Sequence, residues 1–134
     1  MSVTFERKGV SDDPLALSAF YKELRKYSPL SADEQIKLAI RAKAGDLKAQ
    51  KILVNSNQRF IISVAKEFQN STMGILDLTN EGTIGLITSI SKFDEGKGVK
   101  FLSYAVWWIS HAIYKACYDN GDAIRMPVNR ITAI

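Results

Sequence analysis

The segment 97–115 combines large aromatic side chains with lysines. It contains both tryptophans of the chain, side by side at Trp107 and Trp108, with Phe101 and Tyr104 just upstream. Exposed aromatic rings stack on unpaired bases while nearby ammonium groups contact phosphates, so this composition favours binding of a single nucleic-acid strand. A stripe of aromatic side chains that packs a core has the same composition, and the segment alone leaves both interpretations open.

The spacing of these aromatic residues is helical. Phe101, Tyr104 and Trp108 fall at i, i+3 and i+7, on one helix face. Trp107 lies about 100 degrees around the helix from Trp108, so both indoles cannot point fully into the same core. We therefore expect one large aromatic side chain to be partly exposed beside the lysines just upstream of it.

The rest of the chain predicts an all-α fold of about five helices without a sheet, because its apolar residues keep helical spacing. Ser31 and Glu34 form a capping-box pattern, and Asp46 is a second N-cap. Helices are expected at about residues 15–27, from Ser31 to Gly45, 46–69, 76–93 and 100–118. The predicted organisation is a flexible leader (1–13), a helical domain (14–121) and the start of a linker to an absent following domain (122–134).

Composition narrows the functional class. The chain has 134 residues, one cysteine and one histidine, so we expect neither a disulfide nor a zinc site, and no cofactor. No apolar run reaches the roughly 20 residues of a membrane span, which predicts a cytoplasmic protein without membrane contact. Five basic and two acidic residues between Lys97 and Ile134 place +3 of the net charge of +4 there. No phosphate loop or nucleophile–His–acid set points to an enzyme or a small-molecule substrate.

The stretch Val99–Ile113 resembles the promoter-melting helix of the sigma-70 family of bacterial RNA polymerase sigma factors. Four other segments match the family pattern in order: NQRFIISVAK at 57–66, LDLTNEGTIGLI at 76–87, KFD at 92–94 and IRMPV at 124–128. The resemblance runs from about Leu15 to the C-terminus and covers the second conserved region with part of the preceding one. It implies a transcription initiation factor in a bacterial cell, with a phage-encoded factor as an alternative origin.

The resemblance implies two partners. The first is core RNA polymerase, docked through the clamp helices of its largest subunit, and the implied positions are Leu76, Asp77, Asn80, Glu81, Thr83 and Ile87. The second is promoter DNA, as the single-stranded −10 element, whose flipped adenine would be held by Phe93, Asp94, Lys97, Val99, Ser103, Tyr104 and Trp107. Tyr104 and Trp107 would stack and wedge, Lys100 and Phe101 would support the strand path, and Asn57 would lie near a second flipped base. The remaining implied DNA-binding positions are Trp108, His111, Tyr114 and Lys115.

The chain departs from the family pattern at four positions. Val99 replaces a common aromatic residue, and Ser110 replaces a common arginine. His111 and Tyr114 stand where the family commonly has glutamine and threonine. Because histidine cannot copy the bidentate contact of glutamine with adenine, we expect an altered −10 preference or weak melting. These departures keep open a polymerase-binding adaptor that does not melt DNA.

Overall fold

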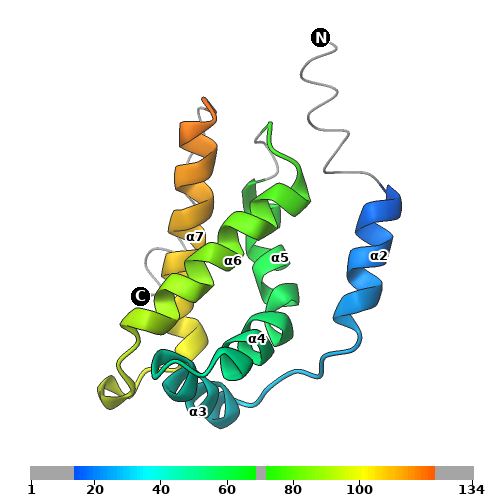
Figure 1. Cartoon of the computed structure of the whole chain (residues 1–134). Helices are drawn as coiled ribbons and strands as arrows, with labels where there is room; N and C mark the ends of the chain where they lie inside the picture. The colour runs from blue at the N-terminus through cyan, green and yellow to red at the C-terminus, as the bar shows by residue number, and fades with distance from the viewer. Residues whose placement is uncertain (1–13, 69–71, 123–134) are drawn as a thin grey trace.

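The predicted helices are present in the computed structural model, which describes residues 14–68 and 72–122 (Figure 1). In chain order they are α2 (Pro14–Leu24), α3 (Ala32–Lys43), α4 (Leu47–Ser56), α5 (Gln58–Ala65), α6 (Ile75–Lys92) and α7 (Phe101–Asp119). Two 3₁₀ turns, η1 (Lys66–Phe68) and η2 (Glu95–Lys97), follow α5 and α6. The described ranges contain no strand, so the all-α prediction is confirmed. The predicted leader and the IRMPV motif lie outside the described residues.

Both predicted N-caps form. The Ser31 hydroxyl accepts a hydrogen bond from the Glu34 backbone N–H at 3.2 Å, and the Glu34 carboxylate accepts one from the Ser31 N–H at 2.9 Å. This backbone hydrogen bond holds the pKa of Glu34 below its ordinary value. The Asp46 carboxylate accepts from the backbone N–H groups of Lys48 and Ala49 and so begins α4. Two donors that a helix start leaves unpaired are thereby satisfied in α4.

The helix predicted over 46–69 is wrong in one respect, because the structure divides it at Asn57. Asn57 has φ −108° and ψ 9°, outside the helical region. Its side-chain amide donates to the Leu53 carbonyl at 2.8 Å and to Gln35 Oε1 at 2.9 Å. Such a side chain offers the backbone carbonyl an alternative to the helical hydrogen bond, so α4 ends and α5 begins in a new direction.

The central pair of the fold is α6 and α7, which cross at close range (Figure 1). Gly85 makes this approach possible: a Cβ at this position would meet the Trp108 carbonyl oxygen and lie 2.9 Å from Ile109 Cα. Gly82 faces the side chains of Ile61, Ile109 and Ile113 instead. Glycine therefore lets the α6 backbone touch the α7 backbone at the turn that carries the tryptophans.

The other helices pack around this pair. The interior includes Leu53, Ile61 and Leu86, each with no exposed surface, and Cys117 is buried there as a core residue. In Figure 1, α2 stands to one side; its last residue, Leu24, is buried. Within residues 14–68 and 72–122, no helix combines the length and the apolar character that crossing a bilayer requires.

Candidate nucleic-acid interface

The corner between α6 and α7 brings together the positions that the resemblance relates to base capture. Helix α6 ends at Lys92, and Phe93 turns the chain out of the helix with ψ 137°. Asp94 then caps η2 by accepting a hydrogen bond from the Gly96 backbone N–H at 2.9 Å. Gly98 follows with φ 70°, a left-handed conformation that favours glycine. These features give the connection a defined path into α7.

Three aromatic rings pack at this corner. Phe93 and Phe101 are exposed by only 2% and 1%, and their rings meet edge to face with centroids 5.2 Å apart. The ring of the half-buried Tyr104 lies 5.9 Å from that of Phe93. Its hydroxyl donates to the carbonyl oxygen of Lys92 at 3.1 Å. Phe93 and Phe101 are therefore core residues that support the corner, and Tyr104 joins this core to the surface.

The two tryptophans diverge as expected, and both are half-buried. Trp108 continues the face of Tyr104, with ring centroids 6.3 Å apart. Trp107 meets Trp108 edge to face at 5.1 Å and packs against His111, with centroids 4.1 Å apart and planes inclined by 34°. Lys92 Nζ lies 5.8 Å from the centre of the Trp108 ring. Sequence reasoning missed the role of this lysine. Lys92 belongs to the KFD motif, but it stands far from the tryptophans along the chain.

The connection to α7 is open to solvent. Its exposed residues include Asp94, Lys97, Val99, Lys100 and the nearby Ser103. Val99 presents 43% of its surface. The corner thus combines exposed lysines in the connection and the exposed Lys92 at the Trp108 ring with partly exposed indoles, a combination that suits a single strand. The geometry of the corner therefore favours the nucleic-acid interpretation of the aromatic segment, although part of its aromatic surface does pack the core.

The second half of α7 differs from the first. His111 and Lys115 are exposed, while Tyr114 is half-buried and its ring lies 6.4 Å from that of Tyr118. Lys115 pairs with Asp119 at 3.2 Å, an exposed contact that contributes little to stability. Ser110 is exposed by only 1%, and its hydroxyl has no hydrogen-bond partner among the described residues. Ser110 thus lies on the packed side of α7, not on the surface that a phosphate would touch.

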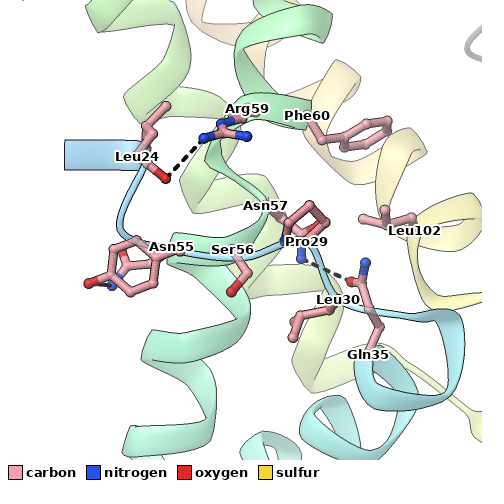
Figure 2. A pocket seen from close by; sticks show the side chains of 11 residues that line it. Leu24, Pro29, Leu30, Gln35, Asn55, Ser56, Asn57, Arg59, Phe60 and Leu102 are labelled. Atoms are coloured by element: carbon pink, nitrogen blue, oxygen red, sulfur yellow. Dashed lines mark hydrogen bonds between the residues drawn. The ribbon is translucent and has the colours of Figure 1, made fainter. Parts of the chain in front are cut away.

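A second concave site lies beside Asn57 (Figure 2). It is a cavity of about 230 Å³ between the α2–α3 connection, the α4–α5 junction and α7, lined by Leu24, Tyr27, Pro29, Leu30, Gln35, Asn55, Ser56, Asn57, Arg59, Phe60 and Leu102. Asn57 is exposed by only 4%, and both of its amide hydrogen bonds go to protein groups. Arg59 donates to the Leu24 carbonyl at 3.4 Å, so the rim is tied to α2. Asn57 therefore shapes this cavity from within.

The outer face of α6 carries the positions related to polymerase docking. One exposed stripe of α6 consists of Asp77, Asn80, Ile84 and Ile87. Ile84 is 56% exposed and Ile87 is 37% exposed. Leu76 and Glu81 are half-buried beside them. Sequence reasoning missed Ile84, which the spacing of seven residues from Asp77 could have indicated.

Thr83 is turned towards the neighbouring helix. Its hydroxyl accepts a hydrogen bond from Gln58 Nε2 at 3.0 Å and donates to the Thr79 carbonyl at 2.9 Å. Thr83 therefore links α6 to α5, while the stripe of Asp77 and Ile84 faces outward. In residues 14–68 and 72–122, no group of three or more His, Cys, Asp or Glu side chains is placed to hold a metal ion.

Comparison with known proteins shows which family the chain resembles. The family model described as Sigma-70 region 2 matches residues 53–122, and the one described as Sigma-70 factor, region 1.2 matches residues 16–48. The RNA polymerase sigma factor SigA of Clostridium acetobutylicum is 44% identical over 123 residues, which are 92% of this chain and 32% of that protein. The protein of the same name from Listeria monocytogenes is 42% identical over 123 residues, which again are 92% of this chain and 32% of that protein. The chain thus spans about a third of the length of these relatives (32%). It belongs to the sigma-70 family of RNA polymerase sigma factors.

Proposed function

We propose that this chain docks on core RNA polymerase and recognises and melts the −10 promoter element by capturing non-template bases. The observation that carries the proposal is the match to Sigma-70 region 2 over the residues that build the α6–α7 corner and its two half-buried tryptophans. In this role the chain is an initiation factor without catalysis of its own. It works in the cytoplasm of a bacterial cell, whether the gene is bacterial or carried by a phage.

The corner supports base capture energetically. Extracting a base from the duplex costs a few kcal/mol of unstacking. Stacking on an aromatic side chain returns roughly 1–3 kcal/mol per base, and Tyr104 and Trp107 are two of the partly exposed rings on this part of α7. Lys97 and Lys100 supply cations for the strand, and Asp94 and Ser103 supply polar groups for base edges. Phe93 and Phe101 act from the core by holding this surface in place.

A second base occupies the cavity beside Asn57. The cavity combines apolar walls at Phe60 and Leu102 with polar groups at Asn55 and Ser56, a mixture that suits a planar base with hydrogen-bonding edges. Because the amide hydrogens of Asn57 are already used, its contribution is to fix the shape of the cavity.

The exposed stripe of α6 docks on the clamp helices of the largest polymerase subunit. Its mixture of acidic, amide and apolar side chains suits an interface with a basic partner helix. Ile84 joins the residues taken from the resemblance as the most exposed apolar side chain of the stripe.

The second half of α7, which carries His111 and Tyr114, gives this chain an altered −10 preference. The imidazole of His111 packs on Trp107 at 4.1 Å, and Tyr114 is partly buried beside Tyr118. A bidentate contact with adenine is not available from these two side chains. Promoters selected from a randomised pool should therefore show a weaker base preference at the upstream edge of the element. A strong preference for the usual bases at that edge would contradict this part of the proposal.

The first experiment measures binding of dye-labelled, single-stranded −10 DNA with and without core RNA polymerase. Trp107→Ala should weaken binding in the presence of polymerase by about five- to 150-fold, the equivalent of roughly 1–3 kcal/mol of lost stacking. Tyr118→Ala is the matched control, because it also removes an aromatic ring from α7. Tyr118 is 67% exposed and lies outside the corner. Polymerase binding without strand binding in the wild type would instead identify a docking adaptor.

The docking surface is tested separately by the affinity of the chain for core RNA polymerase. Ile84→Glu places a charge in the centre of the exposed stripe and should weaken this affinity by about tenfold or more. Ile40→Glu places the same charge on α3, at an isoleucine exposed by 40%, and should leave the affinity unchanged. Equal losses in both variants would refute the assignment of the stripe.

A further inference from the structure

The α6–α7 corner is held by a lysine from another helix. Lys43, the last residue of α3, donates a hydrogen bond from Nζ to the carbonyl oxygen of Phe93 at 2.7 Å. The two residues are 50 positions apart, and the contact is partly buried. A charged donor makes this bond short and strong compared with a bond between neutral groups.

The acceptor is a carbonyl group that a helix end leaves without a helical partner. The neighbouring carbonyl, that of Lys92, accepts from the Tyr104 hydroxyl at 3.1 Å. Two consecutive carbonyls at the end of α6 are thus bound by side chains from α3 and α7. An ammonium group at this place also interacts favourably with the negative end of the helix dipole.

The loop after Phe93 depends on its anchors for its orientation. Residues 94–100 are all exposed, and the hydrogen bonds of Gly96, Lys97 and Gly98 join them to Asp94 and Glu95 within the loop itself. Internal bonds preserve the shape of such a loop and leave its direction to the residues at its ends. At its start, the ring of Phe93 is fixed by the core and its carbonyl by Lys43.

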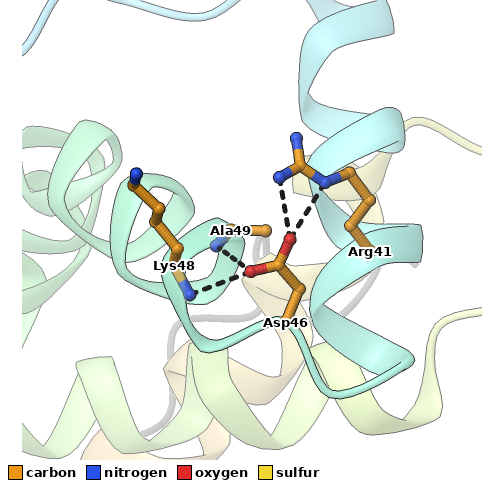
Figure 3. A network of polar contacts seen from close by, with 4 residues as sticks. All are labelled: Arg41, Asp46, Lys48 and Ala49. Carbon is orange, nitrogen blue, oxygen red and sulfur yellow. Dashed lines mark hydrogen bonds and ion pairs between the residues drawn. The ribbon is translucent and has the colours of Figure 1, made fainter.

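The turn that follows Lys43 is itself braced by contacts among Arg41, Asp46, Lys48 and Ala49 (Figure 3). Arg41 donates to Asp46 Oδ2 from Nε at 3.1 Å and from Nη2 at 2.7 Å. The other oxygen of Asp46 accepts from the backbone N–H groups of Lys48 and Ala49. The turn between α3 and α4 is therefore tied on both sides, which fixes the point from which the Lys43 side chain extends.

We propose that Lys43 is a positioning residue for base capture: its ammonium group fixes the Phe93 carbonyl and thereby aims the loop that carries Asp94 and Lys97. This inference rests on the proposed function of the corner. It gives α3 a role in base selection although Lys43 itself need not touch DNA. It also predicts that loss of the ammonium group impairs the choice of base more than it impairs folding.

The test compares two dye-labelled −10 strands in the presence of core RNA polymerase, one with adenine and one with an abasic site at the captured position. Lys43→Met should reduce the ratio of the two affinities about fivefold, a coupling of ordinary size between neighbouring groups. Lys37→Met is the matched control, because it removes an equal charge from an exposed position of the same helix. It should keep the wild-type ratio.

Each outcome decides one question. A wild-type ratio in Lys43→Met, or an equal loss in Lys37→Met, overturns the positioning role while leaving the proposed function intact. Polymerase binding without strand binding in the wild type overturns the proposed function itself. Hydrogen exchange at the backbone amides of Gly96 and Lys97 should be faster in Lys43→Met, and unchanged exchange there would also count against the role. If Lys43→Met does not fold, Lys43→Gln replaces it with the same expected loss.

Discussion

The contact between α6 and α7 predicts a strong and position-specific effect of a single methyl group. In Gly85→Ala, the new Cβ would collide with backbone atoms of α7, the carbonyl oxygen of Trp108 and the Cα of Ile109. Backbone atoms within a helix cannot rotate away, so the two helices must separate. In Gly82→Ala, the new Cβ would lie 2.7 Å from Ile61 Cγ2 and 3.1 Å from Ile113 Cδ1, so side chains of the core must shift, while the two helix backbones can keep their distance.

The size of the effect follows from two opposing contributions. Overpacking of a tight interior typically costs 1–3 kcal/mol and sometimes more, and a clash with backbone belongs at the upper end. Alanine is favoured over glycine within a helix by about 1 kcal/mol, which offsets part of this cost. We therefore expect Gly85→Ala to lower the free energy of unfolding by about 2–3 kcal/mol and Gly82→Ala by about 1 kcal/mol or less.

Thermal unfolding followed by circular dichroism measures this difference. For a chain of this size, 2–3 kcal/mol corresponds to a fall in Tm of roughly 10 °C. Gly82→Ala serves as the control, because it makes the same chemical change on the same helix one turn away. A Gly85→Ala variant as stable as the wild type, or more stable than it, would show that the α6–α7 contact is looser than the structure has it.

Three further predictions concern single contacts. Asn57→Leu leaves Gln35 Oε1 without its buried donor and should cost about 2 kcal/mol in urea unfolding; a change below 0.5 kcal/mol would contradict it. Hydrogen bonds, above all the one from the Ala49 backbone N–H, lower the pKa of Asp46 from 3.8. The stability that this carboxylate contributes is therefore complete above pH 3.8 and is lost as the pH falls through the lower pKa of the folded state. The stabilities of Asp46→Asn and the wild type should therefore converge in acid, and a constant difference would refute this. Tyr104→Phe loses the bond to the Lys92 carbonyl and should cost about 1 kcal/mol, while strand affinity, measured by dye-labelled DNA, stays within about threefold.

Local signals in the sequence were sufficient to predict much of the fold. The capping box at Ser31 and the cap at Asp46 act within one helical turn, so their residues stand next to one another in the chain. Gly121 has φ 90° and follows the last turn of α7, as the Asn–Gly pair predicts. The helical spacing of the apolar residues likewise agrees with the helices that the structure has at Ile75–Lys92 and Phe101–Asp119.

The division of the long predicted helix at Asn57 could not be read from local signals. Asparagine within a helical pattern is tolerated in many contexts, and the local sequence does not state where its amide will bind. The deciding partner is Gln35, on α3, whose side-chain oxygen accepts from Asn57 across 22 positions of the chain. A contact of this kind exists only once the helices are packed.

The same distinction applies to the α6–α7 corner. The types of its side chains were evident from the sequence, since Tyr104, Trp107 and the lysines stand within a short segment. Two contacts that support the corner come from elsewhere: Lys43 of α3 binds the Phe93 carbonyl, and Lys92 at the end of α6 lies over the Trp108 ring. We expect the exposed loop after Phe93 to gain its orientation from the Lys43 contact. The substitutions to test first are therefore those at the supporting contacts, because they separate the chemistry of the rings from their placement.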